Sequence, residues 1–156
     1  MRVFLAYDGN LAAVPFLEKA LDAWAEVRFA EPSVMELESG EKFEIQRRVV
    51  ADGLAKDDFY ILADIDAVPE EPYVISAIHK MLPTRPDMGM ALIRPVFSVG
   101  GRVRVIRKGL VEKWPAQRTM TYDQEHGEAI IKAGKQVEMW DDIHYRLLPS
   151  PIALVN

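Results

Sequence analysis

The chain has 156 residues, 49% of them hydrophobic, which suits one domain with a substantial core. Its formal charge of −5 is spread without long blocks of like charge, so neither a basic nucleic-acid surface nor a polybasic membrane anchor is expected. It has no cysteine, and the N-terminal stretch MRVFLAYDGN shows no signal-peptide or membrane-span pattern. We therefore expect a single domain over residues 1–156, located in the cytoplasm, without nucleic-acid or membrane partners.

The first part of the chain predicts strands and helices in alternation. The apolar runs VFLAY and FYILA each end in charged or turn residues, as buried strands do. Apolar residues at helical spacing predict amphipathic helices between them. The expected elements are a strand at 3–7, a helix from Pro15 to Trp24, a strand at 26–30, a helix at 41–54 and a strand at 59–63.

The second part departs from strict alternation. A helix follows Pro72 and a strand covers 88–93, but RVRVIR (102–107) alternates polar and apolar residues, which is typical of a half-exposed or edge strand. A helix that starts near 121 and is capped by Gly134 precedes short strands at 136–140 and 145–148. The sequence thus predicts an α/β fold: a three-layer α/β/α sandwich whose central sheet is mostly parallel at first and mixed later.

Two carboxylates follow directly on the strand FYILA. Asp64 and Asp66 are two residues apart, so they share one side of the chain if its extended geometry continues. Such like charges repel unless a cation lies between them or one group takes up a proton. Hard oxygen ligands at the carboxyl end of a strand suit Mg²⁺ or Mn²⁺. Alternatively, both aspartates are solvated turn residues that merely end the strand.

The segment YILADIDAVPEEP resembles the DxD segment of the GT-A-fold nucleotide-sugar glycosyltransferases. The resemblance implies that Asp64 and Asp66 bind a divalent metal, Mn²⁺ or Mg²⁺, which holds the donor diphosphate, and that Asp64 helps to place the ribose. The opening VFLAYDG is similar to the first strand of that family. This likeness implies donor contacts, at the nucleobase, for Ala6, Tyr7 and Asp8.

A basic residue often lies about one helix upstream of the DxD in that family, and Arg47 is in this region. Helical spacing places Arg47 on an inward stripe with Phe43 and Val50, where a cation should have a partner. A donor phosphate or one of the aspartates could be that partner. Equally, the stem of the arginine could pack while its head reaches water.

The stretch TYDQEHGEAI adds a second resemblance, to the glycogenin-like transferases, which carry a DQ pair at a helix start and a later LP pair. Here Asp123-Gln124 and Leu148-Pro149 match that order. The resemblance implies that Asp123, or else Glu125, is the catalytic acid that acts at the acceptor. Acidic residues in a first helical turn are also favoured by the helix dipole alone.

Two further candidates come from residue type and place. The resemblance implies a histidine as third metal ligand, and His144 matches best, although a solvated loop histidine fits as well. Trp114 could stack on a sugar ring of the acceptor, or it could be part of the core.

The sequence as a whole indicates a minimal, metal-dependent glycosyltransferase acting on a nucleotide-sugar donor and an unknown acceptor. A neighbouring subunit could complete the acceptor side in a small homo-oligomer. One alternative is a phosphohydrolase of the haloacid dehalogenase type, with Asp64 as nucleophile and Asp66 as acid/base. Another is a catalytically degenerate domain of the transferase fold that binds a nucleotide or a partner.

Overall fold

The computed structural model describes residues 1–37, 43–95, 102–112, 114–115 and 122–148. Seven strands, four α-helices and two 3₁₀ turns are found there. In chain order they are β1 (Arg2–Tyr7), η1 (Leu11–Ala13), α1 (Val14–Ala25), β2 (Glu31–Glu36), α2 (Phe43–Ala51), β3 (Phe59–Asp64), β4 (Ala67–Pro69), α3 (Val74–Met81), η2 (Leu82–Thr84), β5 (Met88–Pro95), β6 (Val103–Arg107), α4 (Tyr122–Lys132) and β7 (Gln136–Leu147). In these residues no helix combines the length and the apolar character needed to cross a membrane.

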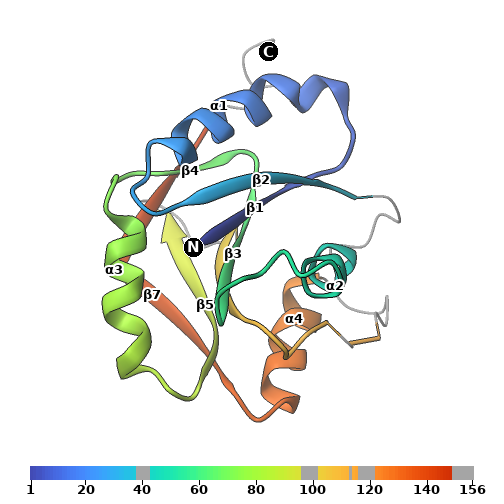
Figure 1. The fold of residues 1–156 in the computed structure, drawn as a ribbon, viewed down its shortest axis with the longest axis vertical. Helices are drawn as coiled ribbons and strands as arrows, with labels where there is room; N and C mark the ends of the chain where they lie inside the picture. Colours follow the sequence, from blue (N-terminus) through green and yellow to red (C-terminus); the bar gives the residue numbers. More distant parts are fainter. Residues whose placement is uncertain (38–42, 96–101, 113, 116–121, 149–156) are drawn as a thin grey trace.

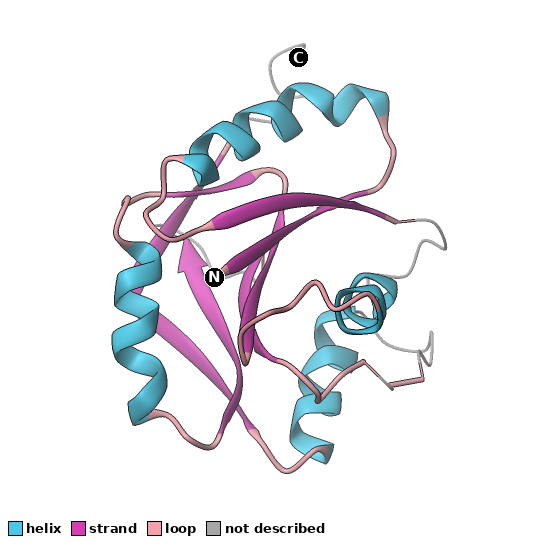
Figure 2. Cartoon of the chain, in the orientation of Figure 1, coloured by secondary structure: helices cyan, strands magenta, loops and turns pink. Residues whose placement is uncertain are grey.

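The strands, magenta in Figure 2, form one sheet in the order β2-β1-β3-β6-β5-β7-β4. The first three strands along the chain are parallel neighbours, with β1 between β2 and β3. β6 then enters antiparallel to both β3 and β5, β7 lies parallel to β5, and the short β4 lies antiparallel to β7. The predicted α/β class and the parallel-then-mixed sheet are confirmed.

Two helices cover each face of the sheet. Alternate residues of a strand point to opposite faces, so Val3 and Leu5 join one buried cluster and Phe4 joins the other. The first cluster includes residues of α1 and α3, and the second includes residues of α2 and α4. Figure 1 shows these pairs of helices on opposite sides of the strands. The three-layer sandwich follows from this division of the core.

The second strand lies further along the chain than expected. Residues 26–30, predicted as a strand, form the turn after α1, in which Phe29 takes a positive φ of 67°, and β2 begins at Glu31. β2 is an edge strand and is only partly buried. An edge position tolerates Pro32, which lacks a backbone donor and disguises the strand in the sequence.

The strand RVRVIR is not at an edge. β6 lies between β3 and β5, and Arg104 in its middle is only 3% exposed. The prediction of a half-exposed or edge strand is therefore wrong. Alternation in this strand separates two buried faces, one of which carries a buried cation.

Three smaller differences complete the comparison with the sequence. The expected strands at 136–140 and 145–148 are one strand, β7, with a register shift where its partners on β5 change from Ile93 to Arg94. The helix expected to 54 ends at Ala51, and Val50, placed on its inward stripe, is 36% exposed. The three-residue β4 was not predicted. Pro149, part of the LP pair, lies outside the described residues.

Candidate functional site

The aspartate pair lies at the edge of the sheet where β1 and β3 both end. These strands are parallel neighbours, and Ala6 is paired with Asp64, the last residue of β3. The chain then turns through Ile65 and Asp66 before β4 begins. Ligands of α/β sheets bind beyond the carboxyl ends of their strands, so this edge is where a substrate site is expected.

A cavity of about 290 Å³ opens at this edge. Its lining combines three carboxylates with small and apolar side chains from β1, from η1 and α1, and from the residues that follow β2 and β3. The lining residues are Ala6, Asp8, Ala13, Phe16, Leu37, Asp64, Ile65 and Asp66. Four residues predicted from the sequence, Ala6, Asp8, Asp64 and Asp66, thus share one pocket, while their individual roles stay predictions.

Tyr7 is not among the lining residues. Its side chain is buried, and its hydroxyl donates a hydrogen bond to the carbonyl oxygen of Asn10 at 3.0 Å. The same loop is held by Asp8, whose Oδ1 accepts from the amide of Asn10, also at 3.0 Å. Tyr7 therefore shapes the loop at the end of β1 in this structure.

Arg102 brings positive charge to the aspartates. Arg102 Nη1 lies 2.7 Å from Asp66 Oδ2 and 3.8 Å from Asp64 Oδ2. The same charges act on the hydroxyl of Tyr145 in β7. Burial raises the pKa of this hydroxyl, Arg102 lowers it, and Asp64 and Asp66 raise it. Arg102 was not predicted from the sequence; its signal is an arginine directly before the strand that pairs with β3.

The aspartate pair fits a hard divalent cation. Asp66 Oδ1 is buried and has no hydrogen-bond partner among the residues that the structure describes, so it has a lone pair to offer to a ligand. Carboxylate oxygens are the donors that Mg²⁺ and Mn²⁺ prefer, and such ions complete their shell with water and phosphate. Metal binding by Asp64 and Asp66 stays a prediction.

A third protein ligand is not assembled in this conformation. Within the described ranges, no group of three histidine, aspartate or glutamate side chains lies close enough to hold a metal. His144 lies in the part of β7 that pairs with the end of β5, and its role as third ligand stays a prediction.

Arg47 and Trp114 come together on the side of the sheet covered by α2 and α4. Arg47 Nη2 donates to the carbonyl oxygen of Trp114 at 2.7 Å. The indole of Trp114 packs against the core there, and Lys132 Nζ lies 5.2 Å from the centre of its ring. One face of the ring is thus already in contact with a cation, and sugar stacking on Trp114 stays a prediction.

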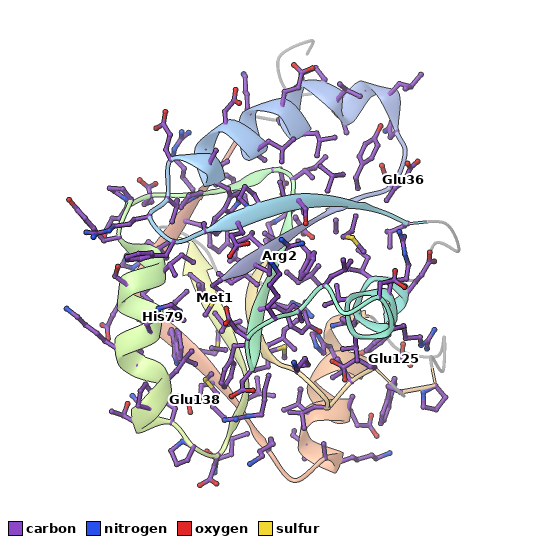
Figure 3. All side chains as sticks on the ribbon, viewed as in Figure 1. Met1, Arg2, Glu36, His79, Glu125 and Glu138 are labelled. Atoms are coloured by element: carbon purple, nitrogen blue, oxygen red, sulfur yellow. The ribbon has the colours of Figure 1, made fainter. Side chains whose placement is uncertain are left out.

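The two candidate catalytic acids lie at the start of α4. Asp123 belongs to its first turn, and the side chain of Asp123 is outside the described part of the structure. Glu125 is only 5% exposed, on the side of the sheet that carries α2 and α4 (Figure 3). Glu125 is thus largely withdrawn from solvent, and the catalytic roles of both acids stay predictions.

Next to Glu125, His126 forms a buried polar cluster with two residues from other elements. Its Nδ1 is 2.6 Å from Arg104 Nη1 of β6, and its Nε2 is 3.0 Å from the side-chain amide of Gln46 of α2. Burial, and then the charge of Arg104, hold the pKa of His126 well below its ordinary value of 6.5. The imidazole is therefore neutral at physiological pH.

The hydrogen bonds fix the tautomer of this imidazole. A guanidinium only donates, so Nδ1 accepts from Arg104 and the ring proton is on Nε2. The structure places Gln46 Nε2 at this position, so the amide has to be turned by about 180° for its oxygen, which has no hydrogen-bond partner among the described residues, to accept from His126 Nε2. One neutral histidine thus joins β6, α2 and α4.

Comparison with known proteins finds similarity at the level of structure. No protein-family model and no curated protein matches the chain. Among solved structures, a glycosyltransferase involved in the glycosylation of the major capsid of PBCV-1 is similar with a TM-score of 0.61 and 11% identity, over 90% of this chain and 81% of that one. S. aureus TarS 1-349 gives a TM-score of 0.64 at 13% identity, over 98% of this chain and 61% of that one.

Two further comparisons bear on length and ligands. The glycosyltransferase GlyE of Streptococcus pneumoniae TIGR4 gives a TM-score of 0.58 at 11% identity, and this chain covers 45% of it. TarS has also been solved in complex with UDP and with UDP-GlcNAc. These likenesses extend over nine-tenths or more of this chain. Together with the sheet order and the strand-end aspartates, they show that the chain has a GT-A-like glycosyltransferase fold.

Proposed function

We propose that this protein transfers a sugar from a nucleoside-diphosphate sugar to an acceptor hydroxyl, with the help of a divalent metal. The observation that carries the proposal is the pocket at the carboxyl edge of β1 and β3, which brings Asp8, Asp64 and Asp66 together. The fold supports it, since structures described as glycosyltransferases share this fold and TarS binds UDP and UDP-GlcNAc.

The pocket offers different surfaces to the two halves of a donor. Ala13, Phe16 and Leu37 form an apolar wall that suits the flat base of a nucleotide. Asp8 can accept hydrogen bonds from the base or the ribose. Asp64 and Asp66 supply the carboxylates that would hold a metal and, through it, the diphosphate. A nucleotide would thus be held by its base at the end of β1 and by its phosphates at the end of β3.

Transfer requires a stabilised leaving group and an activated acceptor. A bound Mn²⁺ or Mg²⁺ would act as a Lewis acid on the departing diphosphate. Asp64 and Asp66 would hold the ion, and the unpartnered Oδ1 of Asp66 is available for this role. Asp123, in the first turn of α4, would orient the acceptor hydroxyl or take its proton. The phosphohydrolase alternative is not favoured, because similar solved structures are described as glycosyltransferases.

A thermal-shift screen tests the proposal. UDP, GDP, CMP and their common sugar conjugates are compared with Mn²⁺, with Mg²⁺ and with EDTA. A ligand at a hundred times its dissociation constant should stabilise the protein by roughly 2.7 kcal/mol. We expect one nucleoside diphosphate to stabilise the protein, and this gain to disappear with EDTA and in Asp66→Asn.

The matched control is Asp22→Asn, which changes an exposed aspartate of α1 outside the pocket and should respond like the wild type. Sugar release from the conjugate selected in the screen is then followed with and without candidate acceptors. A chain that responds to no nucleotide under any metal would contradict the proposed function.

A further inference from the structure

The backbone pairing of two strands brings Arg102 to the aspartates. β6 begins at Val103, which is paired with Ala63 of β3, and the amide of Asp64 donates to the carbonyl oxygen of Arg102 at 2.8 Å. Residues opposite each other in an antiparallel pair project from the same face. The side chain of Arg102 therefore leaves the backbone beside that of Asp64, and the sheet itself fixes this neighbourhood.

The ion pair leaves one oxygen of Asp66 without a partner. One nitrogen of Arg102 faces both carboxylates, at 2.7 Å from Asp66 and 3.8 Å from Asp64. Both of these contacts are made to Oδ2 atoms. Asp66 Oδ1, which is buried, has no hydrogen-bond partner within the described part of the chain. A divalent cation would add positive charge here and give that oxygen a partner.

Arg102 and a divalent ion compete for the same carboxylates. The guanidinium nitrogen lies at the Oδ2 atoms of both aspartates, so its positive charge would repel a cation held by the same two carboxylates, even at Asp66 Oδ1. Metal binding should therefore drive the arginine head away. The side chain is 44% exposed, which leaves it room to turn away from the carboxylates.

The displaced guanidinium would remain next to the pocket. A diphosphate held by the metal would carry its own negative charge to this place, and arginine pairs with phosphate oxygens through two parallel hydrogen bonds. The guanidinium of Arg102, once displaced from the aspartates, thus gains a new partner only when the nucleotide is present.

We propose that Arg102 is an exchangeable counter-ion: it neutralises Asp64 and Asp66 in the empty site and moves to the donor diphosphate when metal and nucleotide bind. This inference rests on the proposed function. Its consequence is a coupling between the two ligands. When the metal binds alone, Arg102 loses its ion pair with the aspartates and gains no new partner. When the nucleotide is also bound, Arg102 pairs with the diphosphate instead. Each ligand therefore raises the affinity for the other by the same factor.

The test measures Mn²⁺ binding by the electron paramagnetic resonance of the free ion, with and without UDP. Arg102→Gln removes the competing charge, so it should bind Mn²⁺ alone on the order of tenfold more tightly than the wild type. The factor by which UDP raises the Mn²⁺ affinity should shrink in the same variant. Arg102→Lys keeps a charge without the planar fork and should lie between the two.

Arg85→Gln is the matched control. Arg85 is 48% exposed and pairs with the carboxylate of Glu138 at 3.4 Å, before β5, at the other end of the strands from Asp64. The Arg85→Gln variant should leave both the Mn²⁺ affinity and its increase by UDP unchanged. Wild-type Mn²⁺ affinity in Arg102→Gln, with UDP still bound by the wild type, would overturn the exchange and leave the proposed function standing. Failure of the wild type itself to bind Mn²⁺ and UDP would instead overturn the proposed function, and the exchange with it.

Discussion

Acidification should destabilise this protein through one buried side chain, His126. In the native state its ring is neutral, because burial and Arg104 hold its pKa well below the ordinary value of 6.5. The unfolded chain takes up a proton near that ordinary value, so below about pH 6.5 the unfolded state binds more protons than the native state. The free energy of unfolding must then decrease as the pH falls, until the native pKa is reached.

The magnitude follows from the ordinary pKa alone. Between about pH 7.5 and about pH 5.5 a histidine that stays neutral in the native state contributes a loss of about 1.4 kcal/mol. For a chain of this length such a loss lowers the melting temperature by about 3–6 °C. The loss is a difference between two pH values, so it does not depend on how stable the protein is at neutral pH.

Urea unfolding at the two pH values, followed by circular dichroism, measures this loss. His126→Gln keeps an oxygen that can accept from Arg104 but cannot be protonated, so it removes the contribution of this one group. The wild type should lose about 1.4 kcal/mol more than the variant, whatever the other ionisable groups contribute. Equal losses in the two proteins would show that His126 is protonated in the native state, and would refute the neutral tautomer derived from its contacts.

Two other predictions use single substitutions with built-in comparisons. A Cβ at Gly89 would lie 2.7 Å from Ile130 Cγ2 and 2.8 Å from Lys135 Cβ, so Gly89→Ala should lower the free energy of unfolding in urea by about 1–3 kcal/mol. A Cβ at Gly127 would meet nothing within 4 Å, so Gly127→Ala should raise that free energy by about 0.4–1 kcal/mol. Equal effects of the two substitutions would contradict the close packing of β5 at Gly89. Asp123→Asn should leave nucleotide binding unchanged and lower turnover by about 10²–10⁴-fold, and unchanged turnover would remove Asp123 from the mechanism.

Half of the pocket lining was indicated by the sequence. The apolar run before Asp64 indicates a buried strand, and the rule that ligands of α/β sheets bind beyond the carboxyl ends of the strands points to Asp64 and Asp66. The resemblance of VFLAYDG to the first strand of the transferases implied Ala6 and Asp8, and all four residues line the pocket. The rule says nothing about side chains that arrive from elsewhere. Phe16 and Leu37, which complete the pocket, come from the elements that follow β1 in the chain.

The strands that the sequence misplaced share a physical cause. A pattern of polar and apolar residues reports polarity, and it predicts exposure only where polar side chains reach water. In β6 the polar Arg104 reaches His126 instead, 22 residues further along the chain. In β2 polar residues do belong to a strand that is partly exposed, because an edge strand can start with Glu31-Pro32. Neither the distant partner nor the edge position is encoded in the strand's own residues.

The two arginines of the β6 segment connect the aspartates with the start of α4. Arg102 and Arg104 are two residues apart, so they leave the same face of the chain, the first beside Asp64 and Asp66 and the second beside His126. Protonation of His126 would set two cations at hydrogen-bond distance inside the core, and the relief open to the protein is to separate α4 from β6. Because α4 carries Asp123 and β6 carries Arg102, the same event would disturb both sides of the proposed reaction. A loss of nucleotide binding that follows the acid destabilisation in the wild type, but not in His126→Gln, would therefore reveal this connection.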